Sequence, residues 1–135
     1  MSVFVEVSIG ELLDKLSILQ IKQERISDPE KLKNINREAD TLSLAWERSA
    51  LPKEKISEEI SALREANEKL WDLEDKIREK EAALCFDEEF IETARNVYIN
   101  NDKRADIKKR INNKLGSQLI EEKSYADYAE EQKLD

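Results

Sequence analysis

The stretch "SIGELLDKLSILQIKQERI", residues 8–26, decides how the rest of the chain can be arranged. Ser8 followed three residues later by Glu11 is a capping box, which predicts a helix that begins here and runs to the end of the stretch. At about 100° per residue, its leucines fall on one face, whereas Ile18 and Ile21 fall on roughly the opposite face. A helix that is apolar on two sides is usually covered on two sides. We therefore expect this helix at the centre of the fold or in a subunit contact.

Four more helices are predicted downstream by apolar residues spaced three and four apart. They span about residues 29–49, 52–84, 88–99 and 103–115. Asp28 and Asp87 precede helix starts as N-cap candidates, and Gly116 is a C-terminal stop. The sequence "NND" at residues 100–102 indicates a break before the last helix, with Asp102 as its cap.

The predicted fold class is all-α, with one helical domain over residues 1–135. The helices at residues 29–49 and 52–84 are joined by a short loop that contains Pro52, so we expect them to fold back as a long antiparallel hairpin. The N-terminal helix and the C-terminal helices then pack alongside this hairpin.

The two ends of the chain differ from its helical middle. "VFVEV", residues 3–7, alternates β-branched and aromatic residues, which indicates a strand or an extended arm over residues 1–7. Because no second segment of this kind exists, we favour the arm, although pairing with the same segment of another subunit stays open. This unpaired segment and the two-sided first helix together predict a homodimer. Residues from about 126 to 135 are acidic and are expected to fray.

The composition excludes several classes of partner. A formal charge of −8 argues against generic affinity for nucleic acid or anionic membrane surfaces. No apolar run approaches the roughly 20 residues that span a bilayer, and the N-terminus does not have the pattern of a signal peptide. Cys85 is the only cysteine, which excludes an intramolecular disulfide and suits a reducing cytoplasm. The predicted localisation is therefore cytoplasmic.

The sequence contains no histidine. This removes the commonest base at neutral pH, the usual zinc ligand and every Ser-His or Cys-His nucleophile pair. We therefore expect no zinc site. A divalent cation held by carboxylates stays open as a cofactor.

Two carboxylates fall in an apolar seam within "KLWDLEDKIREKE", residues 69–81. Around the helix axis, Glu81 lies about 20° and Glu74 about 40° from Leu70. Burying an unpaired carboxylate there would cost several kcal/mol of stability unless water reaches it. Two hypotheses follow: ion pairs at a solvent-washed edge that fix helix register, or a polar pocket between helices for a small ligand or a divalent cation.

A basic stretch supplies further candidates. "RNVYINNDKRADIKKRINN", residues 95–113, also contains Lys108, Lys109 and Arg110, and it indicates either a solvated helix face or an anion site, for instance for a phosphate. The residues proposed to bind a ligand are Lys15, Lys22, Glu74, Arg78, Glu81, Arg95, Tyr98 and Arg104. No catalytic residue and no metal ligand is assigned.

Two families of all-helical enzymes offer partial resemblances. "EFIE" is similar to the ExxE motif of the helical nucleoside-triphosphate pyrophosphohydrolases, but Asp102 and Asp106 do not supply their second motif, ExxD. The first helix, with Asp14 and Arg25, resembles that of the helical chorismate mutases, whose later cationic motif is missing here.

A resemblance over nearly the whole chain is to an uncharacterised all-helical family of bacteria and phages. It rests on "VEVSIGELLDKLSILQIKQERI", "LW-x-x-ED-x-IR-x-KE", "FDEEFI-x-x-AR-x-VY-x-x-ND-x-RA-x-IK" and "GS-x-L-x-EEKSY". Related segments occur with tetratricopeptide or sugar-transferase regions, which implies an accessory role in surface-glycan synthesis. The resemblance implies no catalytic residue.

The first functional hypothesis is a non-enzymatic helical module that binds or assembles with its own copies or with another protein. The alternative is a small all-α enzyme or ligand-binding protein. Its interhelical pocket, lined by carboxylates, lysine and arginine, would take an anionic metabolite such as a sugar phosphate or a nucleotide. Whether the protein is an enzyme stays open.

Overall fold

A computed structural model describes residues 1–128, and these residues form four α-helices without any strand. The helices are α1 (Ile9–Arg25), α2 (Pro29–Arg48), α3 (Ser57–Ala82) and α4 (Glu88–Leu115), and a 3-10 turn, η1 (Lys53–Ile56), precedes α3. The all-α prediction is therefore confirmed. Most of the predicted frayed tail, residues 129–135, lies outside the described residues.

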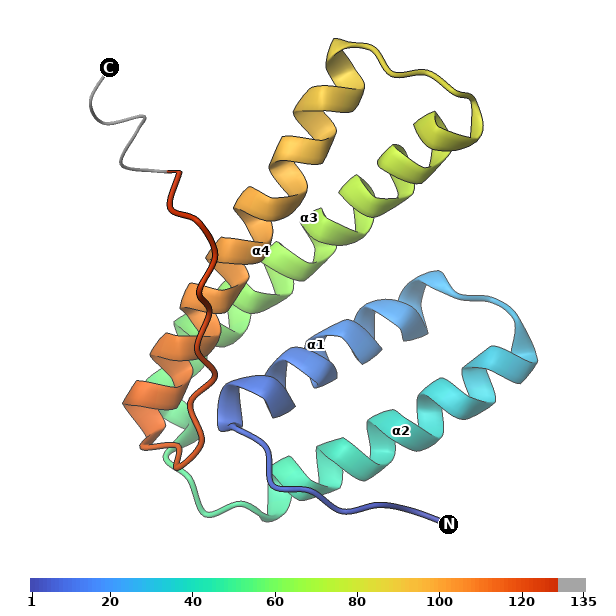
Figure 1. Cartoon of the computed structure of the whole chain (residues 1–135). Helices are drawn as coiled ribbons and strands as arrows, with labels where there is room; N and C mark the ends of the chain where they lie inside the picture. The colour runs from blue at the N-terminus through green and yellow to red at the C-terminus, as the bar shows by residue number, and fades with distance from the viewer. Residues whose placement is uncertain (129–135) are drawn as a thin grey trace.

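The helices are arranged as two antiparallel hairpins, α1 with α2 and α3 with α4 (Figure 1). A long hairpin is present, but its partners are α3 and α4. The predicted pairing across Pro52 is wrong, because α1 lies between α2 and α3 and no packing of α2 along α3 occurs among the described residues. Which helices pair depends on contacts between residues that are far apart in the sequence. Here the two apolar faces of α1 determine the pairing.

The core confirms the central place of α1. On the side of α3 and α4, Leu13 and Leu16 belong to a cluster of seven buried aliphatic residues: Leu13, Leu16, Ile56, Leu63, Ile107, Ile111 and Leu115. On the other side, Leu19 packs with Ile35 and Ala39 of α2 in a cluster of three buried residues. Because stabilisation grows with buried apolar area, the interface of α1 with α3 and α4 is the larger source of stability.

The caps predicted at Ser8, Asp28 and Asp87 are confirmed, whereas Asp102 lies inside α4 and caps no helix. Ser8 Oγ accepts the Glu11 N–H at 3.1 Å, Asp87 Oδ1 accepts the Phe90 N–H at 2.9 Å, and Gly116 has the left-handed φ of 66° that a helix stop favours. Asp28 caps α2 in the same way. The side chain of Glu11, which a capping box would direct back to the start of the helix, pairs with Lys108 of α4.

The predicted break at residues 100–102 is wrong, because α4 runs through them without interruption. Asparagine side chains disfavour helix interiors when they compete for the backbone. Here the side chains bond within the helix and leave it intact: Asn100 is buried and its Nδ2 donates to the Asn96 backbone carbonyl at 2.7 Å, while Asn101 Oδ1 accepts from Arg104 at 2.8 Å.

Residues 1–7 form an extended, exposed segment in which Val3, Phe4 and Val5 face solvent. Residues 1–7 thus form no strand within this chain, and pairing of the segment with another subunit stays a prediction. Both apolar faces of α1 are covered within the chain, which removes one of the two reasons for the homodimer, and the homodimer stays a prediction. Among residues 1–128, no helix is long and apolar enough to span a bilayer.

The start of α1 is seated directly on the last turns of α4. The Gly10 N–H donates to Asn112 Oδ1 at 2.7 Å, and the Ile9 N–H donates to Ser117 Oγ at 3.2 Å. A Cβ at position 10 would lie 2.6 Å from the backbone oxygen of Lys108. Only glycine permits this approach.

We expect Gly10→Ala to lower the free energy of unfolding by about 1–3 kcal/mol, because the added methyl group must push α1 away from α4. Urea denaturation followed by circular dichroism measures the loss. Gln20→Ala, at an exposed position of the same helix, serves as the control and should change stability by less than about 0.5 kcal/mol. Equal stability of Gly10→Ala and the wild type would show that the contact is not tight.

A second contact joins α3 to the end of α4. Glu59 is 5% exposed and pairs with Lys114 through Oε1, while its Oε2 is buried without a hydrogen-bond partner among the described residues. The hydrogen bond to Lys114 lowers the pKa of Glu59, against the opposing effect of burial. A lowered pKa means that folding favours the carboxylate, so its contribution to stability is present above pH 4.5 and is lost as the pH falls through the folded-state value.

We therefore expect Glu59→Gln to destabilise the protein at pH 7, and the difference from the wild type to narrow as the pH falls below about 4.5. Urea denaturation at pH 7 and pH 3.5 tests this. Glu58→Gln, at the exposed neighbouring position, should differ little from the wild type at either pH. A difference for Glu59→Gln that is constant with pH would contradict the ion pair.

Candidate functional site

A buried polar network lies between α1, α3 and α4. Asp14 and Ser17 stand one turn apart on α1 and face Asn67 of α3, and all three side chains are buried. The Asn67 Nδ2 donates to Asp14 Oδ1 at 2.9 Å and to Ser17 Oγ at 3.2 Å. Buried polar groups are tolerated when they are hydrogen-bonded, and these bonds fix α1 against α3.

Lys108 connects this network to the surface. Its Nζ lies 2.7 Å from Glu11 Oε2, 3.7 Å from Asp14 Oδ2 and 3.5 Å from Glu121 Oε2. Burial alone would lower the pKa of Lys108, but the hydrogen bond to Glu11 and the charge of Asp14 outweigh it and raise that pKa. The lysine therefore stays charged.

The charges around Lys108 balance. Lys15 lies 4.0 Å from Glu11, and Lys123 lies 3.0 Å from Glu121. The cluster thus contains three lysines, Lys15, Lys108 and Lys123, and three carboxylates, Glu11, Asp14 and Glu121. The charges of this cluster neutralise one another, and the cluster holds α1, α4 and the following segment together.

Arg104, one turn before Lys108 on α4, is held differently. Its Nη1 donates to Asn67 Oδ1 at 3.1 Å and its Nη2 donates to Asn101 Oδ1 at 2.8 Å. Both acceptors are neutral amide oxygens, and no carboxylate of the described residues forms an ion pair with Arg104. Arg104 is therefore a fixed positive charge without a paired negative one.

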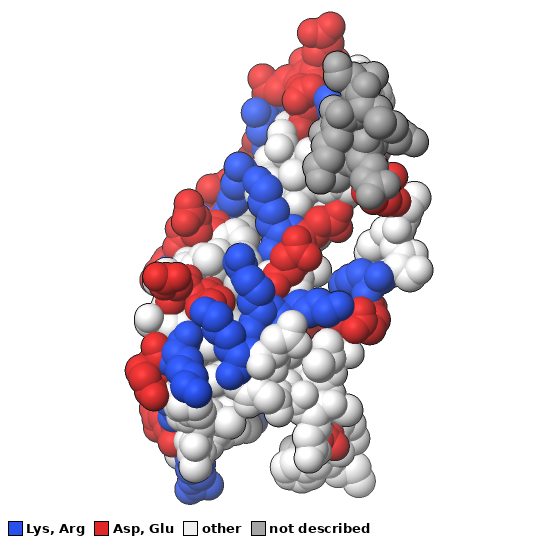
Figure 2. Space-filling model, turned by 90° about the vertical axis from the view of Figure 1, so that its left-hand side faces the viewer, with Lys and Arg blue, Asp and Glu red and all other residues white. Residues whose placement is uncertain are grey.

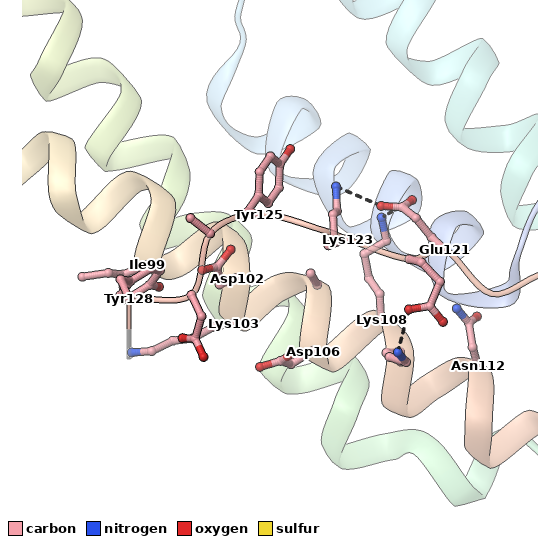
Figure 3. A pocket seen from close by; sticks show the side chains of 15 residues that line it. Ile99, Asp102, Lys103, Asp106, Lys108, Asn112, Glu121, Lys123, Tyr125 and Tyr128 are labelled. Atoms are coloured by element: carbon pink, nitrogen blue, oxygen red, sulfur yellow. Dashed lines mark hydrogen bonds and ion pairs between the residues drawn. The ribbon is translucent and has the colours of Figure 1, made fainter. Parts of the chain in front are cut away.

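The C-terminal segment, residues 117–128, turns back at Gly116 and runs along α4 without regular secondary structure (Figure 1). Glu122 pairs with Lys109 of α4 at 2.9 Å, and the rings of Tyr128 and Tyr98 meet edge to face with their centres 5.3 Å apart. In Figure 3, the segment crosses α4 with Lys108 and Asn112 rising toward it. The segment is attached mainly through side chains.

Opposite charges bring the segment onto α4. Residues 95–115 contain seven lysines and arginines against two aspartates, whereas residues 117–128 contain three acidic residues and one lysine. Figure 2 shows basic side chains gathered in the middle of one face of the molecule, with acidic ones among and around them. The acidic segment covers only part of the basic helix.

A groove lies between α4 and the C-terminal segment. It consists of two cavities of about 530 and 470 Å³ that share seven lining residues: Asp102, Ala105, Lys108, Lys123, Tyr125, Ala126 and Tyr128. Tyr98, Asn101 and Arg104 complete the larger cavity. Volumes of this size are typical of small-molecule sites.

The larger cavity is the positive end of the groove. Arg104, Lys108 and Lys123 line it together with one carboxylate, that of Asp102. A hydrogen bond to Asp102 raises the pKa of the Tyr128 hydroxyl to about 12, so Asp102 already has a donor. Lys108 and Lys123 are already paired with carboxylates, so Arg104 is the cation of this cavity that has no ion pair among residues 1–128.

The predicted site residues are divided by the structure. Tyr98 and Arg104 line the larger cavity, and Lys108 and Lys109 of the same basic stretch line the groove. Arg95 pairs with Glu92 at 3.1 Å and lines neither cavity. Of the sequence features considered, the basic stretch is therefore the one that pointed to residues of the groove.

The residues predicted to form a pocket at the seam are not brought together. Glu81 is exposed, so its predicted inward placement is wrong, and Glu74 is 44% exposed and pairs with its neighbour Arg78 at 3.3 Å. The reason is that α1 covers only the first half of α3, so the seam beyond Leu70 meets solvent.

On α1, Lys15 pairs with Glu11, and no ion pair joins Lys22 to Glu74 or Glu81 among the described residues. Whether any of these side chains binds a ligand stays a prediction.

Several residues of the buried network and of the groove were not predicted from the sequence. Asp14 and Ser17 are polar residues on a helix that its leucines dominate, and Lys123 and Tyr125 belong to a segment without periodicity. One signal was present, because "EEKSY", residues 121–125, is among the motifs that carry the family resemblance. Within residues 1–128, no group of three or more Cys, Asp or Glu side chains is placed to hold a metal ion.

These features define an all-α protein of two helical hairpins with a groove, lined by five cationic and five acidic side chains, between its last helix and the segment that follows. Residues 3–131 match a family of unknown function, DUF6165, and the chain belongs to this family. No curated protein and no solved structure matches the chain.

The charge balance around Lys108 can be tested by comparing two neighbouring lysines. We expect Lys108→Met to lower the free energy of unfolding by about 3–5 kcal/mol, because it leaves Glu11 and Asp14 without their cation. Lys109→Met removes only an exposed pair and should cost about 0–1 kcal/mol. Urea denaturation of both variants gives the comparison, and equal losses would contradict the structural role of Lys108.

Proposed function

We propose that the protein is a non-enzymatic binding protein that holds a small anionic metabolite in the larger cavity of the groove. The observation that carries this proposal is Arg104. Its guanidinium is fixed by Asn67 and Asn101 and lines a cavity that contains three cationic side chains and one carboxylate. A cation that is already held in place loses little freedom when it binds an anion.

The acid–base properties of the groove favour binding over proton transfer. The pKa of Tyr128 is raised to about 12, and the pKa of Lys108 is raised by its carboxylate neighbours. The pKa of Glu121 is lowered by its hydrogen bond to Lys123. A general acid or base works best with a pKa near the operating pH, and each of these shifts leads away from neutrality.

The wider setting remains part of the proposal. The resemblance to segments that accompany tetratricopeptide or sugar-transferase regions supports an accessory role in surface-glycan synthesis. The single cysteine, which suits a reducing compartment, supports a cytoplasmic location. A homodimer and a protein partner are compatible with the exposed N-terminal arm. None of these is needed for the groove to bind an anion.

Isothermal titration calorimetry with ribose 5-phosphate, UMP and pyrophosphate tests the proposal. We expect at least one of them to bind the wild type, and Arg104→Gln to weaken that binding about 10-fold or more, because a charge-assisted hydrogen bond is removed. Arg110→Gln is the matched control, since Arg110 is exposed on the same helix and lines neither cavity. The Arg110→Gln variant should bind the same compound with the affinity of the wild type.

Two results would overturn the proposal. The first is a wild type that binds none of the three compounds. The second is an equal loss of affinity in Arg104→Gln and Arg110→Gln, which would show only a general effect of surface charge. Higher salt should weaken binding to the wild type, since the contact is ionic.

A further inference from the structure

The three tyrosines of the larger cavity are not equivalent. The rings of Tyr98 and Tyr128 meet edge to face, and the Tyr128 hydroxyl is bonded to Asp102. Tyr125 lines both cavities and is 77% exposed. Its ring contributes little to the core, so it is the aromatic surface that the groove leaves open.

The polar groups of the larger cavity are mostly engaged. Asp102 accepts from Tyr128, and the amide oxygen of Asn101 accepts from Arg104. A bare sugar needs several free hydrogen-bonding groups to recognise its hydroxyls. What the cavity offers instead is a cationic end and an aromatic and aliphatic wall made by Tyr125, Ala105 and Ala126.

The geometry points to a nucleoside monophosphate as the ligand, with its phosphate on Arg104 and its base stacked on the ring of Tyr125. This inference rests on the proposed function and specifies the ligand class. Lys123, which pairs with Glu121, lies over one face of the Tyr125 ring with its Nζ 5.9 Å from the ring centre, so the base is expected to stack on the other face. The ligand bridges α4 and the C-terminal segment.

Calorimetric titrations with UMP, AMP and ribose 5-phosphate separate the base from the phosphate. Stacking of a base on an aromatic side chain strengthens binding about 10-fold or more. We therefore expect UMP or AMP to bind at least that much more tightly than ribose 5-phosphate. Tyr125→Leu should reduce nucleotide affinity to that of ribose 5-phosphate and leave ribose 5-phosphate itself unchanged, whereas Tyr125→Phe should retain tight binding.

The outcomes distinguish the two proposals. Ribose 5-phosphate that binds as tightly as the nucleotides, or a Tyr125→Leu variant that loses both ligands equally, would overturn the nucleotide assignment and leave the anion site standing. Absence of binding by these three compounds and by pyrophosphate would overturn both. Because the Tyr125 side chain is largely exposed, the variants should fold, and their circular dichroism melting curves verify this.

Discussion

The contact between Gly10 and Asn112 is the constraint on which the rest of the structure depends. It brings the first turn of α1 against the backbone of α4, at a distance that any side chain at position 10 would prevent. That placement puts Glu11 and Asp14 beside Lys108, and Asp14 in turn positions Asn67. The side-chain amide of Asn67 then accepts a hydrogen bond from Arg104. One missing Cβ thus leads, by successive contacts, to the fixed cation of the groove.

The groove combines a rigid side with a loosely held one. The α4 side belongs to a helix whose inner face is buried against α1 and α3. The other side is the C-terminal segment, which the ion pairs of Glu121 and Glu122 and the ring of Tyr128 attach to α4. Exposed ion pairs contribute little stability each, so the segment can separate from α4 without disturbing the core. A ligand that touches both sides would restrain it.

The sequence predicts what is local. The caps at Ser8, Asp28 and Asp87 and the stop at Gly116 depend on a few neighbouring residues, and all are correct.

Two of the wrong predictions, the helix pairing and the placement of Glu81, depend on long-range partners, whereas the asparagines at the predicted break have partners three and four residues away. The hairpin was assigned from a short loop, although the two faces of α1 decide the pairing. The break at residues 100–102 was assigned from asparagines whose partners stabilise the helix. The inward placement of Glu81 followed a heptad pattern that continues beyond the length its neighbours cover.

For the site, the basic stretch identified Tyr98 and Arg104, because a run of cations is visible without a structure. Asp14 and Asn67 were not identifiable as partners, since nothing in the sequence shows that positions 53 residues apart share a hydrogen bond.

The far end of the α3–α4 hairpin has a different character from the end that carries the groove. Among the described residues, none between 71 and 92 is fully buried, and Lys76 and Lys80 join the two helices there through exposed pairs with Glu89 and Asp87. Such a region opens locally at a small free-energy cost. Backbone amides at this tip should therefore exchange their hydrogens rapidly while those beside Asn112 stay protected, and the molecule can loosen at one end without disturbing the groove at the other.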